Sequence, residues 1–372
     1  MAKHPTPEKG RSSASRGGPF AALAFAAILA GGAEAATPGH ARPTAHVEAS
    51  FDCGEARSKL EKSICDDPAL RAADRAVAGA YRQALARVPR EWREPLRDSQ
   101  RSWLAYMAVV CMPGDLERRE EGATVANCRR DEFKDRAKAL AATLSNPSGY
   151  ALVALTTYRA RAAPAQEAAD GDLPRSAQSQ ALLLQIARPA DPSERRWNAM
   201  IAKRLAQLMA DETDTVADGG VVIDSATPGF IQATVRRSDE RGPGGVSVRL
   251  IPVAWSLRLG RELTAADLFG DPAAGAGAVA RLAFRQMKTN AAQSGDTEAF
   301  APTLSEIREL VAPMRYWSLT KKGLDLTFDD DNAYGGGHYA AVALSTTVSW
   351  SDLAPYLRSD LPLDLRALRD SR

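Results

Sequence analysis

The four cysteines of this 372-residue chain all lie in one segment near its start: Cys53, Cys65, Cys111 and Cys128. An even, clustered set of cysteines is typical of disulfides in an exported protein. Zinc is the alternative partner for four cysteines, but no Cys-x-x-Cys spacing occurs and no histidine lies among them. We therefore expect two disulfides, although four cysteines allow three different pairings.

The first 35 residues have the pattern of a secretory signal peptide. A basic stretch precedes an apolar run over residues 19–30, and Ala33-Glu34-Ala35 is a small-x-small cleavage site. The alternative is an N-terminal membrane anchor that is never cleaved, although the apolar run is short for a membrane-spanning helix. We expect cleavage near Ala35 and a periplasmic or secreted protein with no transmembrane segment in its mature chain.

The charge balance points to neither of two common partner classes. Residues 1–35 contain four Lys/Arg and two Asp/Glu, so the rest of the chain has 44 of each sign. A formal net charge of zero favours neither nucleic acid nor an anionic membrane surface as a partner.

The sequence predicts two domains after a flexible N-terminus over residues 36–50. Residues 51–145 show apolar residues at helical spacing, which predicts an all-α bundle stapled by disulfides. Residues 146–179 contain an Asn-Pro-Ser-Gly stretch and an Ala-rich polar run, and we interpret them as a linker. Residues 180–365 mix helical and alternating patterns, which predicts an α+β domain with a mainly antiparallel sheet.

No catalytic centre, metal site or cofactor site is predicted. A Ser-His-Asp arrangement would need His338, which follows three glycines in a predicted turn. Asp329, Asp330 and Asp331 lack the spacing of a calcium loop and are expected at the tip of a hairpin. The protein is therefore expected not to be an enzyme, and a hydrolase dependent on His338 is the weakest alternative.

Asp74 and Gln100 are polar residues on otherwise apolar helical stripes. Two interpretations are open. Either side chain can hydrogen-bond buried backbone, or it can contact a binding partner.

Residues 51–140 resemble the lysozyme-inhibitor LprI-like family, whose members are small exported helical domains with four cysteines. The resemblance rests on a spaced set of residues: Cys53, Glu61, Ile64-Cys65, Leu70, Asp74, Tyr81, Gln100-Arg101-x-Trp103-Leu104, Cys111, Cys128 and Arg136-x-x-x-Leu140. One departure is clear, because Met107 and Ala108 stand where the family usually has an Arg-Asp pair. If that pair contacts the partner, binding by this chain is weaker or different.

Residues 180–358 resemble a second family, the extracellular domain shared by the sigma-V anti-sigma factor and some peptidoglycan deacetylases. The similar segments are Trp255–Thr264 with Asp267-Leu268-Phe269, and later Leu319-Thr320-x-x-Gly323-Leu324, Phe328 and Tyr334. In the anti-sigma factor this domain recognises lysozyme, so both resemblances imply the same partner.

These resemblances imply a binding protein that recognises and inhibits a lysozyme-type muramidase and so protects peptidoglycan. The alternative is an envelope module that binds peptidoglycan or another glycan without an enzyme target. Proximity in the sequence favours Cys53–Cys65 and Cys111–Cys128 over the interleaved pairing. Each bond would then stabilise the fold by roughly 3 kcal/mol through the entropy of the loop it closes.

The acidic hairpin tip at Asp329, Asp330 and Asp331 generates a testable prediction. Three adjacent carboxylates would steer this tip toward a basic lysozyme, and such charges act mainly on the association rate. Substituting all three by Asn should slow association at low salt and have less effect at high salt. Stopped-flow association at both salt concentrations checks this, and an unchanged rate in a folded variant would exclude the hairpin from the interface.

Overall fold

The computed structural model describes residues 48–111, 124–146, 150–162, 176–210, 216–240, 246–294, 303–312, 314, 316–327, 345–362, 365 and 368. The predicted signal peptide, residues 163–175 of the predicted linker, the predicted hairpin tip at Asp329–Asp331 and His338 all lie outside these residues. Residues 47–372 group as one compact unit by their contacts. No helix in the described part of the chain has both the length and the apolar character to cross a membrane.

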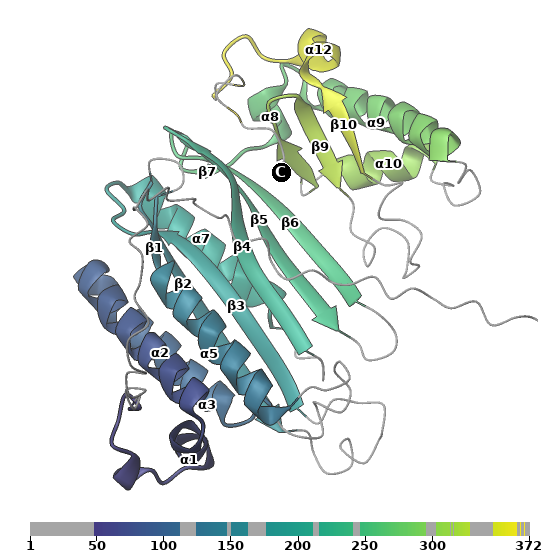
Figure 1. The fold of residues 1–372 in the computed structure, drawn as a ribbon. Coiled ribbons are helices and arrows are strands. Elements are labelled where there is room, and N and C mark those ends of the chain that lie inside the picture. Colours follow the sequence, from purple (N-terminus) through teal and green to yellow (C-terminus); the bar gives the residue numbers. More distant parts are fainter. Residues whose placement is uncertain are drawn as a thin grey trace, which may run out of the picture. The chain divides into compact units, whose positions relative to one another are not determined.

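The cysteine-containing region is helical, as predicted. It contains α1 (Lys59–Asp66), α2 (Pro68–Arg87), α3 (Arg93–Met107) and α5 (Val125–Ala141), with short 3-10 helices at Cys53–Glu55 and Arg90–Trp92 (Figure 1). The start of α1 is a capping box between Ser58 and Glu61, and the Asp67 carboxylate caps α2. The helices pack around a core that includes Leu70, Leu96, Trp103, Phe133 and Leu140.

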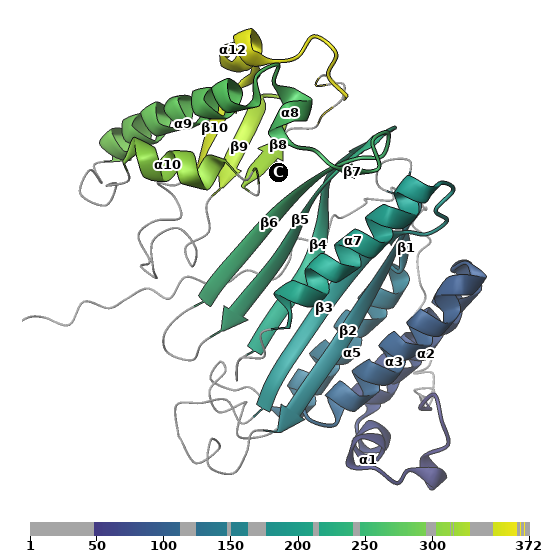
Figure 2. The ribbon, with the colours of Figure 1, turned by 180° about the vertical axis from the view of Figure 1, so that it is seen from behind.

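A seven-stranded sheet follows the helices. Its strands lie in the order β1 (Leu144–Ser145), β2 (Leu152–Ala162), β3 (Ser176–Ile186), β4 (Val216–Thr227), β5 (Phe230–Glu240), β6 (Val246–Ser256) and β7 (Arg261–Glu262). All neighbours pair antiparallel except β3 and β4, which are parallel. Parallel strands need a crossover, and α7 (Pro192–Leu208) supplies it and runs along one face of the sheet, roughly in line with the strands (Figure 2). The sheet is mostly antiparallel, as predicted.

A second, three-stranded antiparallel sheet lies in the C-terminal part. Its order is β10 (Ser345–Ser349), β9 (Gly323–Thr327) and β8 (Trp317–Leu319). It packs with the helices of the same region, and these elements share one apolar core. The helices are α8 (Ala265–Leu268), α9 (Pro272–Ser294), α10 (Leu304–Val311) and α12 (Trp350–Leu353), followed by a 3-10 helix at Ala354–Tyr356.

The interpretation of residues 146–179 as a linker is wrong for the described part of that range. All of β2 and the first residues of β3 lie there, paired over eleven positions. The physical reason is tertiary: Tyr158 of β2 packs into the core of the helical region, and the Ser99 hydroxyl on α3 donates to the Thr156 carbonyl at 2.6 Å. These contacts favour cooperative folding of the helices and the sheet.

Tyr158 gives a direct test of that cooperativity. Its ring lies 5.5 Å from the ring of Tyr106, centroid to centroid, and is buried between α3 and β2. Tyr158→Ala should lower the free energy of unfolding by about 3–5 kcal/mol, as for other buried aromatic residues. Urea unfolding followed by circular dichroism measures this.

Thr157→Ala is the matched control, because Thr157 is the exposed neighbour on the same strand. Its effect should stay within about 0.5 kcal/mol. If Tyr158→Ala leaves the unfolding midpoint of the helical signal unchanged, the helices and the sheet fold independently.

Candidate functional site

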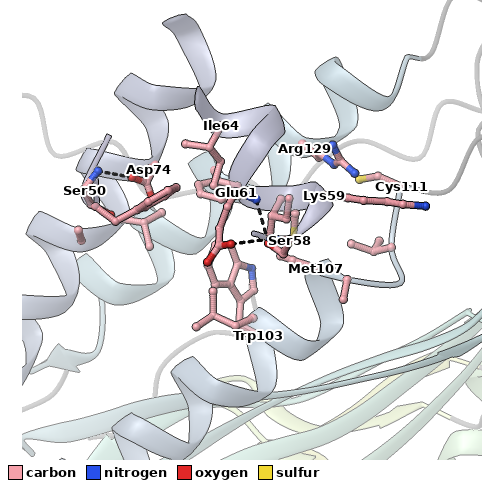
Figure 3. Close-up of a pocket in the computed structure, with 18 of the residues that line it drawn as sticks. Ser50, Ser58, Lys59, Glu61, Ile64, Asp74, Trp103, Met107, Cys111 and Arg129 are labelled. Atoms are coloured by element: carbon pink, nitrogen blue, oxygen red, sulfur yellow. Dashed lines mark hydrogen bonds between the residues drawn. The ribbon is translucent and has the colours of Figure 1, made fainter. Parts of the chain in front are cut away.

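A pocket of about 1120 Å³ lies between α1, α2, α3 and α5 of the helical region (Figure 3). Asp74 and Gln100, the two polar residues singled out in the sequence, both line it. So do Met107 and Ala108, the positions that depart from the LprI-like pattern. The structure thus brings these four residues together at one site, whereas Asp329–Asp331 lie outside the described residues.

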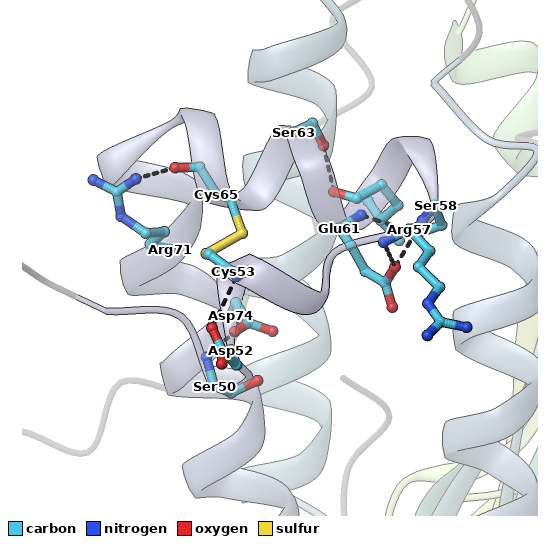
Figure 4. Close-up of a disulfide and its surroundings, with 12 residues drawn as sticks. Ser50, Asp52, Cys53, Arg57, Ser58, Glu61, Ser63, Cys65, Arg71 and Asp74 are labelled. Carbon is cyan, nitrogen blue, oxygen red and sulfur yellow. Dashed lines mark hydrogen bonds between the residues drawn. A yellow bond between two sulfur atoms is a disulfide. The ribbon is translucent and has the colours of Figure 1, made fainter.

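The outer wall of the pocket is the chain before α1, which two interactions hold in place. Cys53 is bonded to Cys65 near the end of α1, so the segment is tied to the joint between α1 and α2 (Figure 4). The Asp74 carboxylate on α2 accepts a hydrogen bond from the Ser50 amide at 2.6 Å. Asp74 is therefore a backbone-bonding residue, one of the two interpretations that the sequence left open. Phe51, between these anchors, lines the pocket.

The second disulfide, Cys111–Cys128, joins the end of the α3 segment to α5. Both pairings agree with the prediction from proximity, and the interleaved pairing is excluded. Cys111 has a left-handed backbone with φ of 64°, which is uncommon for a residue other than glycine. The disulfide and this turn together fix the end of the pocket where Cys111 and Arg129 lie.

A buried arginine, Arg136, contacts two residues that line the pocket, Gln100 and Trp103. We call these two residues the base of the pocket. Arg136 of α5 is 3% exposed, and its Nε donates to Oε1 of Gln100 at 3.0 Å. Its other nitrogens donate to the Ser99 hydroxyl at 3.2 Å and the Tyr158 hydroxyl at 3.4 Å. Burial lowers the pKa of Arg136, but an arginine stays protonated in a protein. No carboxylate pairs with this cation among the described residues.

The bond to Arg136 orients Gln100. A guanidinium only donates hydrogen bonds, so the Gln100 atom that it contacts must be the carbonyl oxygen. The Gln100 amide nitrogen has no partner in the described part of the chain, and Gln100 lines the pocket. The site therefore presents one fixed amide donor at a base that includes Trp103.

The charged residues of the lining fall into two classes. The Glu61 carboxylate accepts the amides of Arg57 and Ser58 at 2.9 and 2.7 Å, and these backbone bonds lower its pKa. Asp74 is likewise occupied, by Ser50. Lys59 and Arg129, in contrast, have no ion-pair or hydrogen-bond partner within the described ranges.

Arg129 is the residue that sequence reasoning missed. Its side chain is half-buried, its Nε is shielded from water without a hydrogen-bond partner, and burial lowers its pKa. In Figure 3, Arg129 and Lys59 lie on the side of the pocket near Cys111, away from Asp74 and Ser50. Nothing in the spacing of basic residues on α5 distinguishes Arg129 from its paired neighbour Arg130, so only the fold reveals it.

A metal site is not formed by the residues that the structure describes, because no group of three histidine, cysteine or carboxylate side chains meets there. The expectation that the protein needs no metal or cofactor stays a prediction.

The helical region is similar in sequence to a known family, and the chain has distant structural neighbours. Residues 53–140 match the sequence model of a family described as "Lysozyme inhibitor LprI". No curated protein matches the chain. Among solved structures, a DUF3298 family protein from Pseudomonas aeruginosa PAO1 has a TM-score of 0.41 and 12% identity, covering 57% of this chain and 96% of its own. A DUF3298 member from Bacteroides fragilis has a TM-score of 0.38 and 10% identity, covering 58% and 96% respectively.

These matches confirm the first predicted resemblance and do not show the second. The similarity of residues 180–358 to the anti-sigma-factor and deacetylase domain stays a prediction. What the comparisons do establish is that residues 53–140, which form most of this pocket, are similar to the LprI lysozyme-inhibitor family.

Proposed function

We propose that this chain is an exported binding protein that recognises and inhibits a lysozyme-type muramidase through its helical region, and so protects peptidoglycan. The observation that supports this most directly is the match of residues 53–140 to the lysozyme-inhibitor family. Both disulfides lie within the matched residues. Disulfides persist in oxidising compartments, which agrees with export to the place where lysozyme acts.

Inhibition of this kind is binding rather than catalysis, and the chain acts in this proposal without enzymatic activity. The surface around the pocket offers a suitable contact. Leu104 on α3 is 49% exposed and lies at the pocket. Among the described residues of the helical region, it is the one large apolar side chain that is so exposed. Exposed apolar residues at the centre of a contact are typical binding hot spots.

A muramidase assay with the oxidised full-length protein tests the proposal. We expect saturable inhibition of a lysozyme by the unmodified chain. Leu104→Arg should weaken this inhibition at least about tenfold, because it places a cation against a basic enzyme and removes apolar contact.

Leu259→Arg is the matched control, since Leu259 is 40% exposed in a turn of the sheet-rich region. It should leave inhibition unchanged. Absence of inhibition across the lysozyme classes would refute the proposal. Retention on purified peptidoglycan without inhibition would instead support the glycan-binding alternative.

A further inference from the structure

The interior of the helical pocket has the properties of a small-molecule site. Its volume of about 1120 Å³ slightly exceeds the usual range for pockets that enclose drug-sized ligands, roughly 300–1,000 Å³. The lining is dominated by apolar side chains from four helices and the preceding segment: Phe51, Leu60, Ile64, Val77, Leu104, Met107, Val110 and Phe133. Protein interiors are normally close-packed, so an apolar pocket of this size favours an apolar occupant.

The charged residues of the lining indicate where a charged group of the occupant would bind, and of which sign. Both carboxylates, Glu61 and Asp74, already accept backbone hydrogen bonds. The Arg129 guanidinium and the Lys59 ammonium are unpaired among the described residues and lie on the same side (Figure 3). The buried Arg136 cation stands behind the base of the pocket and is bonded only to neutral groups. The available charge is therefore positive, and it lies at one end of an apolar surface.

We propose that this pocket binds a long-chain fatty acid, with its aliphatic chain on the apolar wall and its carboxylate on Arg129. A guanidinium matches a carboxylate through two parallel hydrogen bonds, and Lys59 adds a second positive charge on the same side of the pocket. The proposal does not rest on lysozyme recognition, because it is argued from the pocket lining, of which Leu104 is shared with the proposed lysozyme contact.

A sugar ligand fits the lining less well. Sugar hydroxyls need many hydrogen-bond partners, but apolar side chains dominate the lining. Besides the Gln100 amide and the two cations, the described lining adds the hydroxyls of Ser50, Ser58 and Tyr81. Trp103, the largest aromatic residue of the lining, is only 1% exposed, so it offers little surface for a sugar ring to stack on. The same shortage of partners opposes an inserted peptide, whose backbone amides would be left unbonded.

Titration calorimetry with palmitate, below its micelle concentration and without lysozyme, tests the proposal on the full-length oxidised protein. We expect saturable binding at one site. Hexadecanol, with the same chain and no charge, should bind at least about tenfold more weakly, because it lacks the charge-assisted bonds to Arg129. Shortening the chain should lower the affinity by roughly fourfold per methylene group.

Three variants make the test specific to this pocket. Arg129→Gln should weaken palmitate binding to the level of hexadecanol and leave hexadecanol binding unchanged. Arg130→Gln is the matched control, since Arg130 is the next residue on α5, pairs with Asn127 and Asp67, and does not line the pocket. Ala108→Trp should fill the pocket and weaken both ligands.

Several results would overturn the proposal. One is no palmitate binding, and another is equal binding of palmitate and hexadecanol that Arg129→Gln does not change. A third is full binding by a folded Ala108→Trp variant, which would indicate adsorption elsewhere. Binding of soluble peptidoglycan fragments in place of palmitate would identify a glycan site instead. Because lysozyme is absent, failure here is distinct from failure of the muramidase assay.

Discussion

The buried guanidinium of Arg136 is the interaction on which the arrangement of the helical region depends. It connects three elements at once, since it lies on α5 and donates to Ser99 and Gln100 on α3 and to Tyr158 on β2. Its charge also stacks on aromatic rings, 5.3 Å from the ring centroid of Tyr158 and 5.9 Å from that of Trp103. Removing this side chain would leave the three elements without their shared polar contact.

This arrangement explains why the pocket has a defined base. Ser99 is bonded both to Arg136 and to the Thr156 carbonyl, so α3 has a fixed position on β2. Gln100 and Trp103 lie on the same helix and are positioned by the same cation. A buried charge with only neutral partners is costly to desolvate, and the hydrogen bonds and ring contacts offset part of that cost. The pocket is therefore built on a rigid polar contact, although its own lining is apolar.

The sequence predicted the local features of the helical region well, because they depend on neighbouring residues. Apolar residues at helical spacing predicted helices in residues 51–145, and the structure contains them. Proximity also gave the correct disulfides. The strand β2 was not predicted, because its formation depends on residues distant in the sequence. Its Ala- and Arg-containing sequence has no strong alternation of apolar and polar residues. It forms a strand because it pairs with β3 and packs on α3.

The candidate site was only partly predictable for a related reason. A polar residue on an apolar stripe is visible in the sequence, and this identified Asp74 and Gln100. What each one bonds to depends on distant residues, such as Ser50 for Asp74 and Arg136 for Gln100. Arg129 gave no signal at all, because an unpaired cation is recognised only when its surroundings are known.

A second buried arginine shows what distinguishes a structural charge from one near a binding site. Arg237 on β5 is 1% exposed and pairs with the equally buried Asp239 at 2.6 Å. It also donates to the Leu208 carbonyl at the end of α7, which ties that helix to the sheet. There the carboxylate balances the charge within the protein. In the helical region, Arg136 and Arg129 have no such counter-ion among the described residues. Arg129 lines the apolar pocket, and Arg136 donates to Gln100, which also lines it. An anion that enters this pocket would supply the charge that Asp239 supplies to Arg237.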